Sequence, residues 1–194
     1  MSSIENDVAQ ILSDFQSESD RGLALVAAAH LDQKLEGTIS AFFCETKSSK
    51  ALINVPYAPL GTLSAKIDIC HALGLIDDYE YAETHAIRRI RNIFAHSDRK
   101  LDFADSQVAK ECAKLTSEYP IEEGKIVPSR ALFLNAAVKM SLHLYYRANL
   151  VTKERRVQRS YVTKDQTRWR SLKNETPKNG DSAILLFQEE KGRR

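Results

Sequence analysis

The chain has 194 residues, of which 43% are hydrophobic, so it is long enough to bury one substantial core. Its seven glycines and five prolines favour long helices over many tight hairpins. The formal net charge is only +2, which excludes a strongly polybasic or polyacidic protein. The charge is unevenly spread, because residues 1–150 hold 16 basic and 20 acidic side chains, whereas residues 151–194 hold 12 and 6.

Cysteine spacing argues against a metal-binding protein, and hydropathy argues against a membrane-spanning one. Cys44, Cys70 and Cys112 stand far apart and form no CxxC pair, so we expect no metal site. A sparse, odd number of cysteines is typical of a reducing compartment. No stretch approaches the roughly 18 apolar residues of a membrane span, and the N-terminus lacks the basic region of a signal peptide. We therefore expect a cytoplasmic protein with no cofactor and no contact with membranes.

Apolar residues recur every three or four positions along most of the chain, which is typical of amphipathic helices. The periodic segments are residues 4–15, 21–45, 61–76, 78–96, 105–119 and 130–150. The second is apolar nearly all round at "LALVAAA", where small side chains permit close helix packing, so we expect it to be central. Residues 46–60 contain two prolines and are predicted to be a loop.

No convincing alternation of period two interrupts the first 150 residues, so the sequence predicts an all-α fold, a helical bundle of about six helices with a basic C-terminal extension. We place the helical domain at residues 1–152 and the extension at residues 153–194. Near the end of the extension, "SAILLFQ" is predicted to be a short strand or a docking segment.

The extension is a candidate nucleic-acid interface, because basic residues alternate there with aromatic ones. Basic side chains neutralise phosphates and aromatic rings stack on bases. The candidate contacts are Arg155, Arg156, Arg159, Arg168, Trp169 and Arg170. The alternative is a solvated amphipathic helix or a solubilising tail, which the composition favours.

The stretch "RIRNIFAHSDRKLDF", residues 89–103, carries the strongest candidate for chemistry. A histidine can move a proton at a ribose hydroxyl, and an arginine can hold the scissile phosphate, so the two suffice for RNA cleavage without metal. Arg91, Asn92 and His96 are therefore the candidate catalytic residues. On an ideal helix Arg91 and His96 are displaced by about 140°. They meet only if the helix frays near His96, or if two symmetric chains pair.

A structural interpretation competes with the chemical one, and the residues alone favour it. A histidine at a helix C-terminus is stabilised by the helix dipole and can bind free carbonyls. Arginine and asparagine near a helix end can also tie neighbouring helices together.

Three ordered blocks resemble the mannitol operon repressor (MltR) family. They are "ESDRGLALVAAAHLDQKLE", "PLGTLSAKIDICHALGLI" and "IRRIRNIFAHS" followed by "LDF", and they span roughly Ser17 to Leu115. The resemblance implies an all-helical transcriptional regulator that lacks a helix-turn-helix. The sequence likewise offers no short helix, glycine turn and basic second helix. The resemblance therefore implies repression through a protein partner.

The segment Arg91–His96 also resembles the signature of HEPN-type helical domains, an arginine, a polar residue, three more residues and a histidine. Many such domains are ribonucleases of toxin–antitoxin and defence systems. The resemblance implies that Arg91 and His96 are catalytic, that Asn92 is the flanking polar residue, and that the cleft forms between two protomers of a homodimer.

Two functions follow from these resemblances, and the longer match ranks regulation first. The leading hypothesis is a repressor-type regulator that acts through protein–protein contacts. The alternative is a metal-independent ribonuclease, a toxin or defence effector that cleaves single-stranded RNA and is paired with an antitoxin. No residue of the sequence indicates a site for mannitol.

Overall fold

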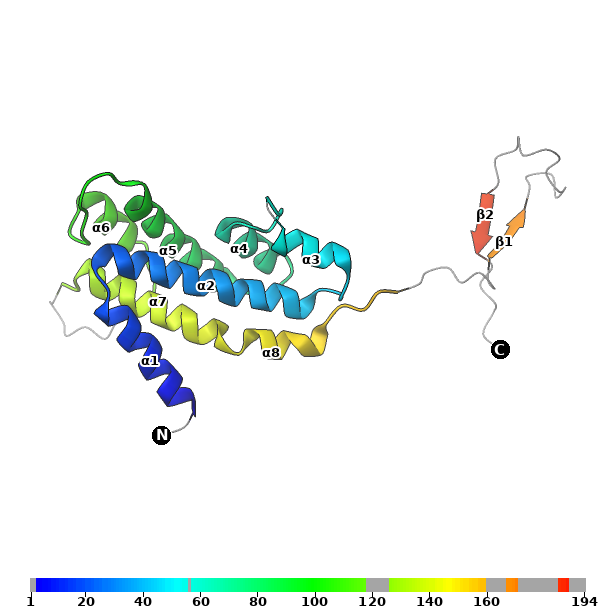
Figure 1. Cartoon of the computed structure of the whole chain (residues 1–194), viewed down its shortest axis with the longest axis horizontal. Helices are drawn as coiled ribbons and strands as arrows, with labels where there is room; N and C mark the ends of the chain where they lie inside the picture. Colours follow the sequence, from blue (N-terminus) through cyan, green and yellow to red (C-terminus); the bar gives the residue numbers. More distant parts are fainter. Residues whose placement is uncertain (1–2, 56, 118–125, 160–166, 171–184, 189–194) are drawn as a thin grey trace. The chain divides into compact units, whose positions relative to one another are not determined.

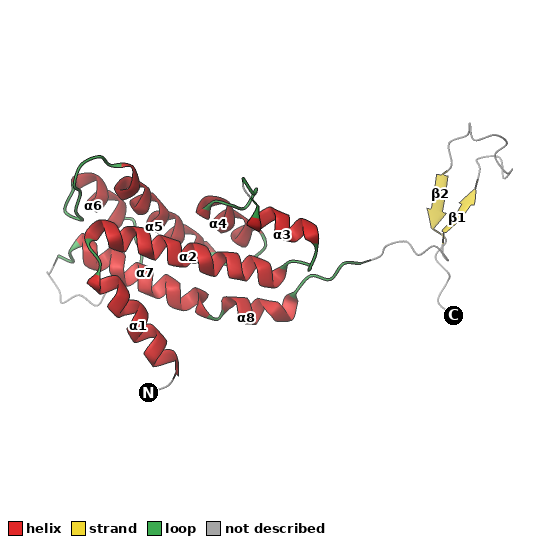
Figure 2. Ribbon diagram, viewed as in Figure 1, coloured by secondary structure: helices red, strands yellow, loops and turns green. Residues whose placement is uncertain are grey.

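The computed structural model describes residues 3–55, 57–117, 126–159, 167–170 and 185–188. The chain divides into two compact units, Met1–Val157 and Gln158–Arg194. The first unit is helical and the second contains two short strands (Figures 1 and 2). No helix in the described part of the chain is both long enough and apolar enough to cross a membrane.

The first unit confirms the predicted all-α bundle. Its helices are α1 (Ser3–Ser17), α2 (Asp20–Phe42), α3 (Lys47–Asn54), α4 (Leu63–Ala72), α5 (Asp78–His96), α6 (Ser106–Cys112), α7 (Ser129–Tyr145) and α8 (Arg147–Val151), followed by the 3₁₀ turn Thr152–Glu154. The predicted helix over residues 130–150 is divided at Tyr146, where α7 ends and α8 begins.

Helix α2 lies at the centre of the bundle, as its uniform hydrophobicity predicts. It packs against α4, α5, α7 and α8 (Figure 1). Leu23, Leu31, Leu35 and Ile39 are fully buried, and the small side chain of Ala27 lets its neighbours approach closely. Helix α2 is therefore covered on several sides. Some of its remaining residues, such as Arg21 and Asp32, line surface pockets.

Helix starts follow local capping chemistry. Ser19 Oγ accepts a hydrogen bond from Gly22 N at 3.1 Å at the start of α2. Asp77 and Glu80 form a reciprocal capping box at the start of α5, where each carboxylate accepts the other residue's backbone N–H. Thr62 Oγ1 accepts from Ala65 N at 3.2 Å and starts α4. These caps fix where α4 and α5 begin and therefore which side chains share their faces.

The predicted loop over residues 46–60 is wrong in its first half, because α3 occupies Lys47–Asn54. Thr46 and Ser49 form a capping box that starts this helix, with Thr46 Oγ1 accepting from Ser49 N at 3.1 Å. The first proline of the segment, Pro56, stands two residues beyond the end of the helix, so its conflict with helical backbone does not reach α3.

The second unit contains β1 (Thr167–Arg170) and β2 (Leu185–Gln188), which pair antiparallel. Thr167 lies opposite Gln188, and Arg170 lies opposite Leu185. The strand formed by residues 185–188 falls within "SAILLFQ", where the sequence predicts a strand or a docking segment.

Candidate functional site

Helix α5 carries the three residues predicted to be catalytic. One face of α5 is buried through Ile87, Ile90 and Phe94. That burial fixes the rotation of the helix and leaves Arg91 and Asn92 half-buried, while His96 is exposed in its last turn. Arg91 Nη1 donates a hydrogen bond to Asn92 Oδ1 at 2.9 Å. The structure therefore brings Arg91 and Asn92 together on one side of α5.

His96 belongs to a different surface depression from Arg91. A pocket of about 380 Å³ is lined by Asn92, Ile93, His96, Ser97, Arg99, Leu101 and Gln107. Arg99 in this pocket pairs with Asp105, at 2.8 Å between Nη2 and Oδ2. No hydrogen bond joins Arg91 to His96 in the described part of the chain, and Arg91 is absent from this lining.

Arg91 lines a second pocket, which we call the α5 arginine pocket. It also measures about 380 Å³ and lies where α2, α4 and α5 meet. Its lining residues are Ala28, Ala29, Asp32, Gly61, Thr62, Leu63, Ser64, Arg88, Arg91 and Asn92. Asn92 is thus shared by both pockets, whereas Arg91 and His96 are not. Within one chain, Arg91 and His96 therefore line different pockets in the described part of the structure.

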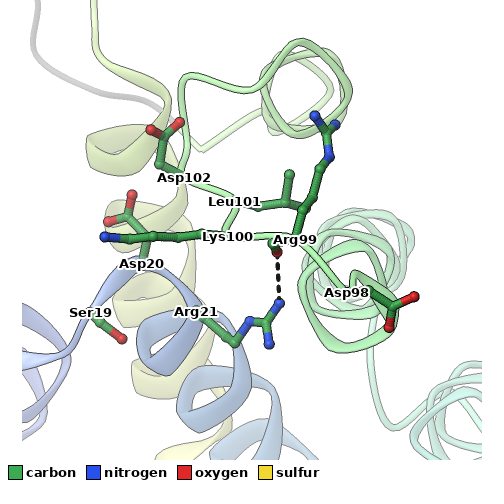
Figure 3. Close-up of a pocket in the computed structure, with 8 residues that line it drawn as sticks. All are labelled: Ser19, Asp20, Arg21, Asp98, Arg99, Lys100, Leu101 and Asp102. Carbon is green, nitrogen blue, oxygen red and sulfur yellow. Dashed lines mark hydrogen bonds between the residues drawn. The ribbon is translucent and has the colours of Figure 1, made fainter.

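The residues after α5 form a third pocket, of about 430 Å³, next to the start of α2 (Figure 3). Arg21 Nη2 donates to the carbonyl oxygens of Ser97, at 2.7 Å, and Arg99, at 3.2 Å. Leu101 and Phe103 are buried beyond them. The polar run "SDRK" is therefore a loop that the side chain of Arg21 ties to α2.

Asp20 extends this attachment to α7. Its Oδ2 accepts from Phe103 N at 3.1 Å, and its Oδ1 accepts from Arg130 Nε at 2.8 Å. Asp20 and Arg21 of "ESDRG" thus contact the loop after α5 and the "LDF" segment that follows it. Its charged groups hold the fold together, because each is engaged with backbone or with an ion-pair partner.

The candidate nucleic-acid residues are divided between the two units of the chain. Arg155 donates from Nε to the carbonyl of Ala41 at 3.0 Å and pairs with Glu45, so it closes the C-terminus of α2. Arg156 N donates to the carbonyl of Phe42 at 2.8 Å. Arg159 is exposed. Arg168, Trp169 and Arg170 lie in β1 of the second unit, and their role as nucleic-acid contacts stays a prediction.

Burial sets the chemistry of the thiols. Burial raises the pKa of the Cys70 and Cys112 thiols to about 12, so neither supplies a thiolate near neutral pH. Cys44 is half-buried. In the described residues, no group of three or more histidine, cysteine or acidic side chains is placed to hold a metal ion.

Arg88 lines the α5 arginine pocket, although the sequence did not single it out as a site residue. Arg88 Nε donates to His85 Nδ1 at 3.2 Å, and His85 Nε2 lies 3.1 Å from Asp68 Oδ1. Burial, the largest effect, and the nearby Arg88 lower the pKa of His85, against the opposing influence of Asp68. The sequence does contain a sign of this pairing, because residues three positions apart, such as Arg88 and Arg91, lie on one side of a helix.

Comparison with known proteins identifies the family. No curated protein matches the sequence significantly. In fold, the chain is similar to a chain in the X-ray structure of the MtlR–HPr complex from Escherichia coli, with a TM-score of 0.51 and 18% identity over 79% of this chain and 99% of that one. The family model described as mannitol repressor (MtlR) matches residues 18–144, which confirms the expected resemblance. The chain therefore belongs to the mannitol repressor family.

Proposed function

We propose that this protein regulates transcription indirectly, by binding a protein partner, and that the partner is an HPr-type protein. The observation that carries the proposal is the likeness of this chain to a chain in the structure of a complex of MtlR with HPr. That likeness covers 99% of the other chain and 79% of this one.

The charge of the helical body supports protein contact over direct DNA reading. Residues 1–150 hold 16 basic and 20 acidic side chains, a net charge of −4 that does not favour binding to a phosphate backbone. DNA-reading helices instead enter the major groove with basic and polar side chains next to phosphates. A regulator with this charge acts more readily through another protein.

The proposal is tested by titrating the purified full-length chain with HPr from the same organism in a calorimeter. We expect one-to-one binding in roughly the micromolar range, about −8 kcal/mol, as is usual for a reversible regulatory contact. A parallel titration with double-stranded DNA at physiological salt serves as the control and is expected to give no sequence-specific binding. A folded chain that binds DNA specifically and does not bind HPr overturns the proposal.

Hydrogen exchange of the complex locates the contact without altering the chain. We expect HPr to slow exchange in the helical unit, which the family match spans, and to leave residues 158–194 unchanged. Protection confined to residues 158–194 contradicts a contact of the family type. Deleting the gene and measuring transcript levels tests the regulatory role, and unchanged transcripts count against it.

A further inference from the structure

We infer that the α5 arginine pocket binds a small oxyanion of the phosphate class through Arg88 and Arg91. The inference goes beyond the proposed partner contact and does not depend on it. It rests on the charge of the pocket, the hydrogen-bonding groups that line it, and the helix end that opens into it.

The two guanidinium groups carry charge that the described residues do not neutralise. Arg88 and Arg91 are half-buried, stand three residues apart on α5 and line the same pocket. Neither has a carboxylate within ion-pair distance among the described residues. Each donates instead to a neutral acceptor, Arg88 to the His85 ring and Arg91 to the Asn92 amide. Like charges at this helical spacing repel each other, so a bound anion would relieve an unfavourable arrangement.

Most of the donors on these two groups are free to bind a ligand. A guanidinium carries five N–H donors in a planar fork that matches the oxygens of a phosphate. Arg88 uses its Nε and Arg91 uses one Nη1 hydrogen in bonds within the described structure. The remaining donors of both forks can be shared by one tetrahedral oxyanion, through charge-assisted hydrogen bonds.

The start of α4 adds backbone donors to the same pocket. Thr62, Leu63 and Ser64 line it, and the first turn of a helix has N–H groups without intrahelical partners. The Thr62 Oγ1 atom accepts a hydrogen bond from the backbone N–H of Ala65, at 3.2 Å, and from no other N–H of this turn in the described structure. The helix dipole places partial positive charge at this end of the ten-residue helix, which complements the two arginines.

One carboxylate lines the pocket, but a lysine engages it. Asp32 Oδ2 lies 2.8 Å from Lys66 Nζ, and Lys66 also pairs with Glu36 at 2.7 Å. The other oxygen of Asp32, Oδ1, is buried and has no hydrogen-bond partner among the described residues. The charged groups that line the pocket are thus two cations and one ion-paired anion, so the potential there favours an oxyanion.

Arg88 is held in place by a chain of neutral and charged groups. Because His85 Nδ1 accepts from Arg88, the proton of the neutral ring sits on Nε2, which donates to Asp68 Oδ1 at 3.1 Å. Asp68 and His85 are therefore positioning residues for Arg88. A fixed guanidinium loses less side-chain entropy when an anion binds.

The test is calorimetric titration of the full chain with inorganic phosphate at constant ionic strength, with chloride replaced equivalent for equivalent. Arg88→Gln and Arg91→Gln each remove one guanidinium from the pocket. Arg89→Gln is the matched control, because it removes the same charge from the same helix, but from a side chain that pairs with Glu111 of α6 at 3.0 Å. We expect phosphate affinity to fall roughly tenfold or more in each pocket variant and less than twofold in the control.

Circular dichroism confirms that each variant is folded, and Arg91→Lys, which keeps the charge but loses the fork, is expected to restore affinity only in part. Phosphate should also raise the melting temperature of the wild type and not that of the double variant Arg88→Gln/Arg91→Gln. Equal phosphate affinity in all variants, or no phosphate binding by the folded wild type, overturns the inference. Either result leaves HPr binding to be judged separately.

Discussion

Arg91 Nη1 donates to Asn92 Oδ1 at 2.9 Å, and these two residues line a pocket that does not include His96. Two of the three residues predicted to be catalytic are thereby brought together, whereas His96 and Arg91 line different pockets on α5. This agrees with the displacement of about 140° that ideal helix geometry gives. The last turn of α5 remains helical through His96, so the chain does not fray to close the gap.

We expect His96→Ala to leave any RNA cleavage unchanged. General acid–base catalysis needs the histidine within reach of the group that the arginine holds, and one chain does not provide this arrangement. The measurement is incubation of single-stranded RNA with wild type and variant in EDTA, followed by gel analysis. Cleavage by the wild type that His96→Ala abolishes would instead support a site assembled between two chains, and with it the predicted homodimer.

Replacing Lys66 by methionine should destabilise the fold by about 2–3 kcal/mol. Lys66 is buried, and its ammonium is the partner of both Asp32 and Glu36. The loss leaves two adjacent carboxylates without a cation, although their partial exposure permits some rehydration. Urea denaturation measures the change. Lys47→Met, at an exposed position of α3, is the control and is expected to change stability by less than about 0.5 kcal/mol.

The stability contributed by Lys66 should not decline as the pH rises from 7 to about 9, a limit set from its ordinary pKa of 10.5. Burial alone lowers the pKa of Lys66, but the hydrogen bonds and charges of Asp32 and Glu36 outweigh it, so the pKa is raised. A raised folded-state pKa gives a contribution that is full below the unfolded value and lost only as pH rises through the folded one. A loss for Lys66→Met that disappears near neutral pH would contradict the ion-pair account.

Stability should fall as the pH drops below about 7, and His30 and His85 should account for part of the fall. Burial is the largest cause that lowers the pKa of both rings from 6.5. Because the unfolded chain binds protons more tightly at these positions, their contribution is full above pH 6.5 and is lost as the pH falls through their folded values. Urea denaturation at pH 7.5, 6.5 and 5.5 should show a shallower decline for His30→Gln/His85→Gln. His96→Gln, at an exposed ring, should retain the wild-type decline.

Only one of the three thiols should react quickly with a disulfide reagent at pH 8. Cys44 is half-buried, whereas Cys70 and Cys112 are fully buried and have pKa values raised to about 12. Stopped-flow absorbance should give one fast equivalent in the native chain and three in urea. Cys44→Ser should lose the fast phase. Three fast equivalents in the folded wild type would show that the bundle opens readily.

The all-α fold was predicted mainly from helix propensity and from the period of the apolar residues. The uniform apolar character of residues 23–29 identified α2 as central, because a helix covered on several sides needs no polar face. The family could also be read from the ordered blocks around Asp20, Arg21 and Phe103. The structure adds that two of these blocks are in contact, since Asp20 accepts a hydrogen bond from the backbone of Phe103. Residues 47–54 were wrongly predicted to be a loop because of the prolines two and five residues beyond them. The capping residue Thr46, which starts α3, was not considered.

The sequence by itself determined which side of each helix is buried and where most of the helices begin, because periodicity and capping act over a few residues. Only the tertiary structure decided what the polar residues of α5 face. Arg88 and Arg91 share a pocket because α4 begins beside them, and the loop after His96 is held against α2 by Arg21. Such neighbours come from elements distant in the chain, so no local pattern specifies them.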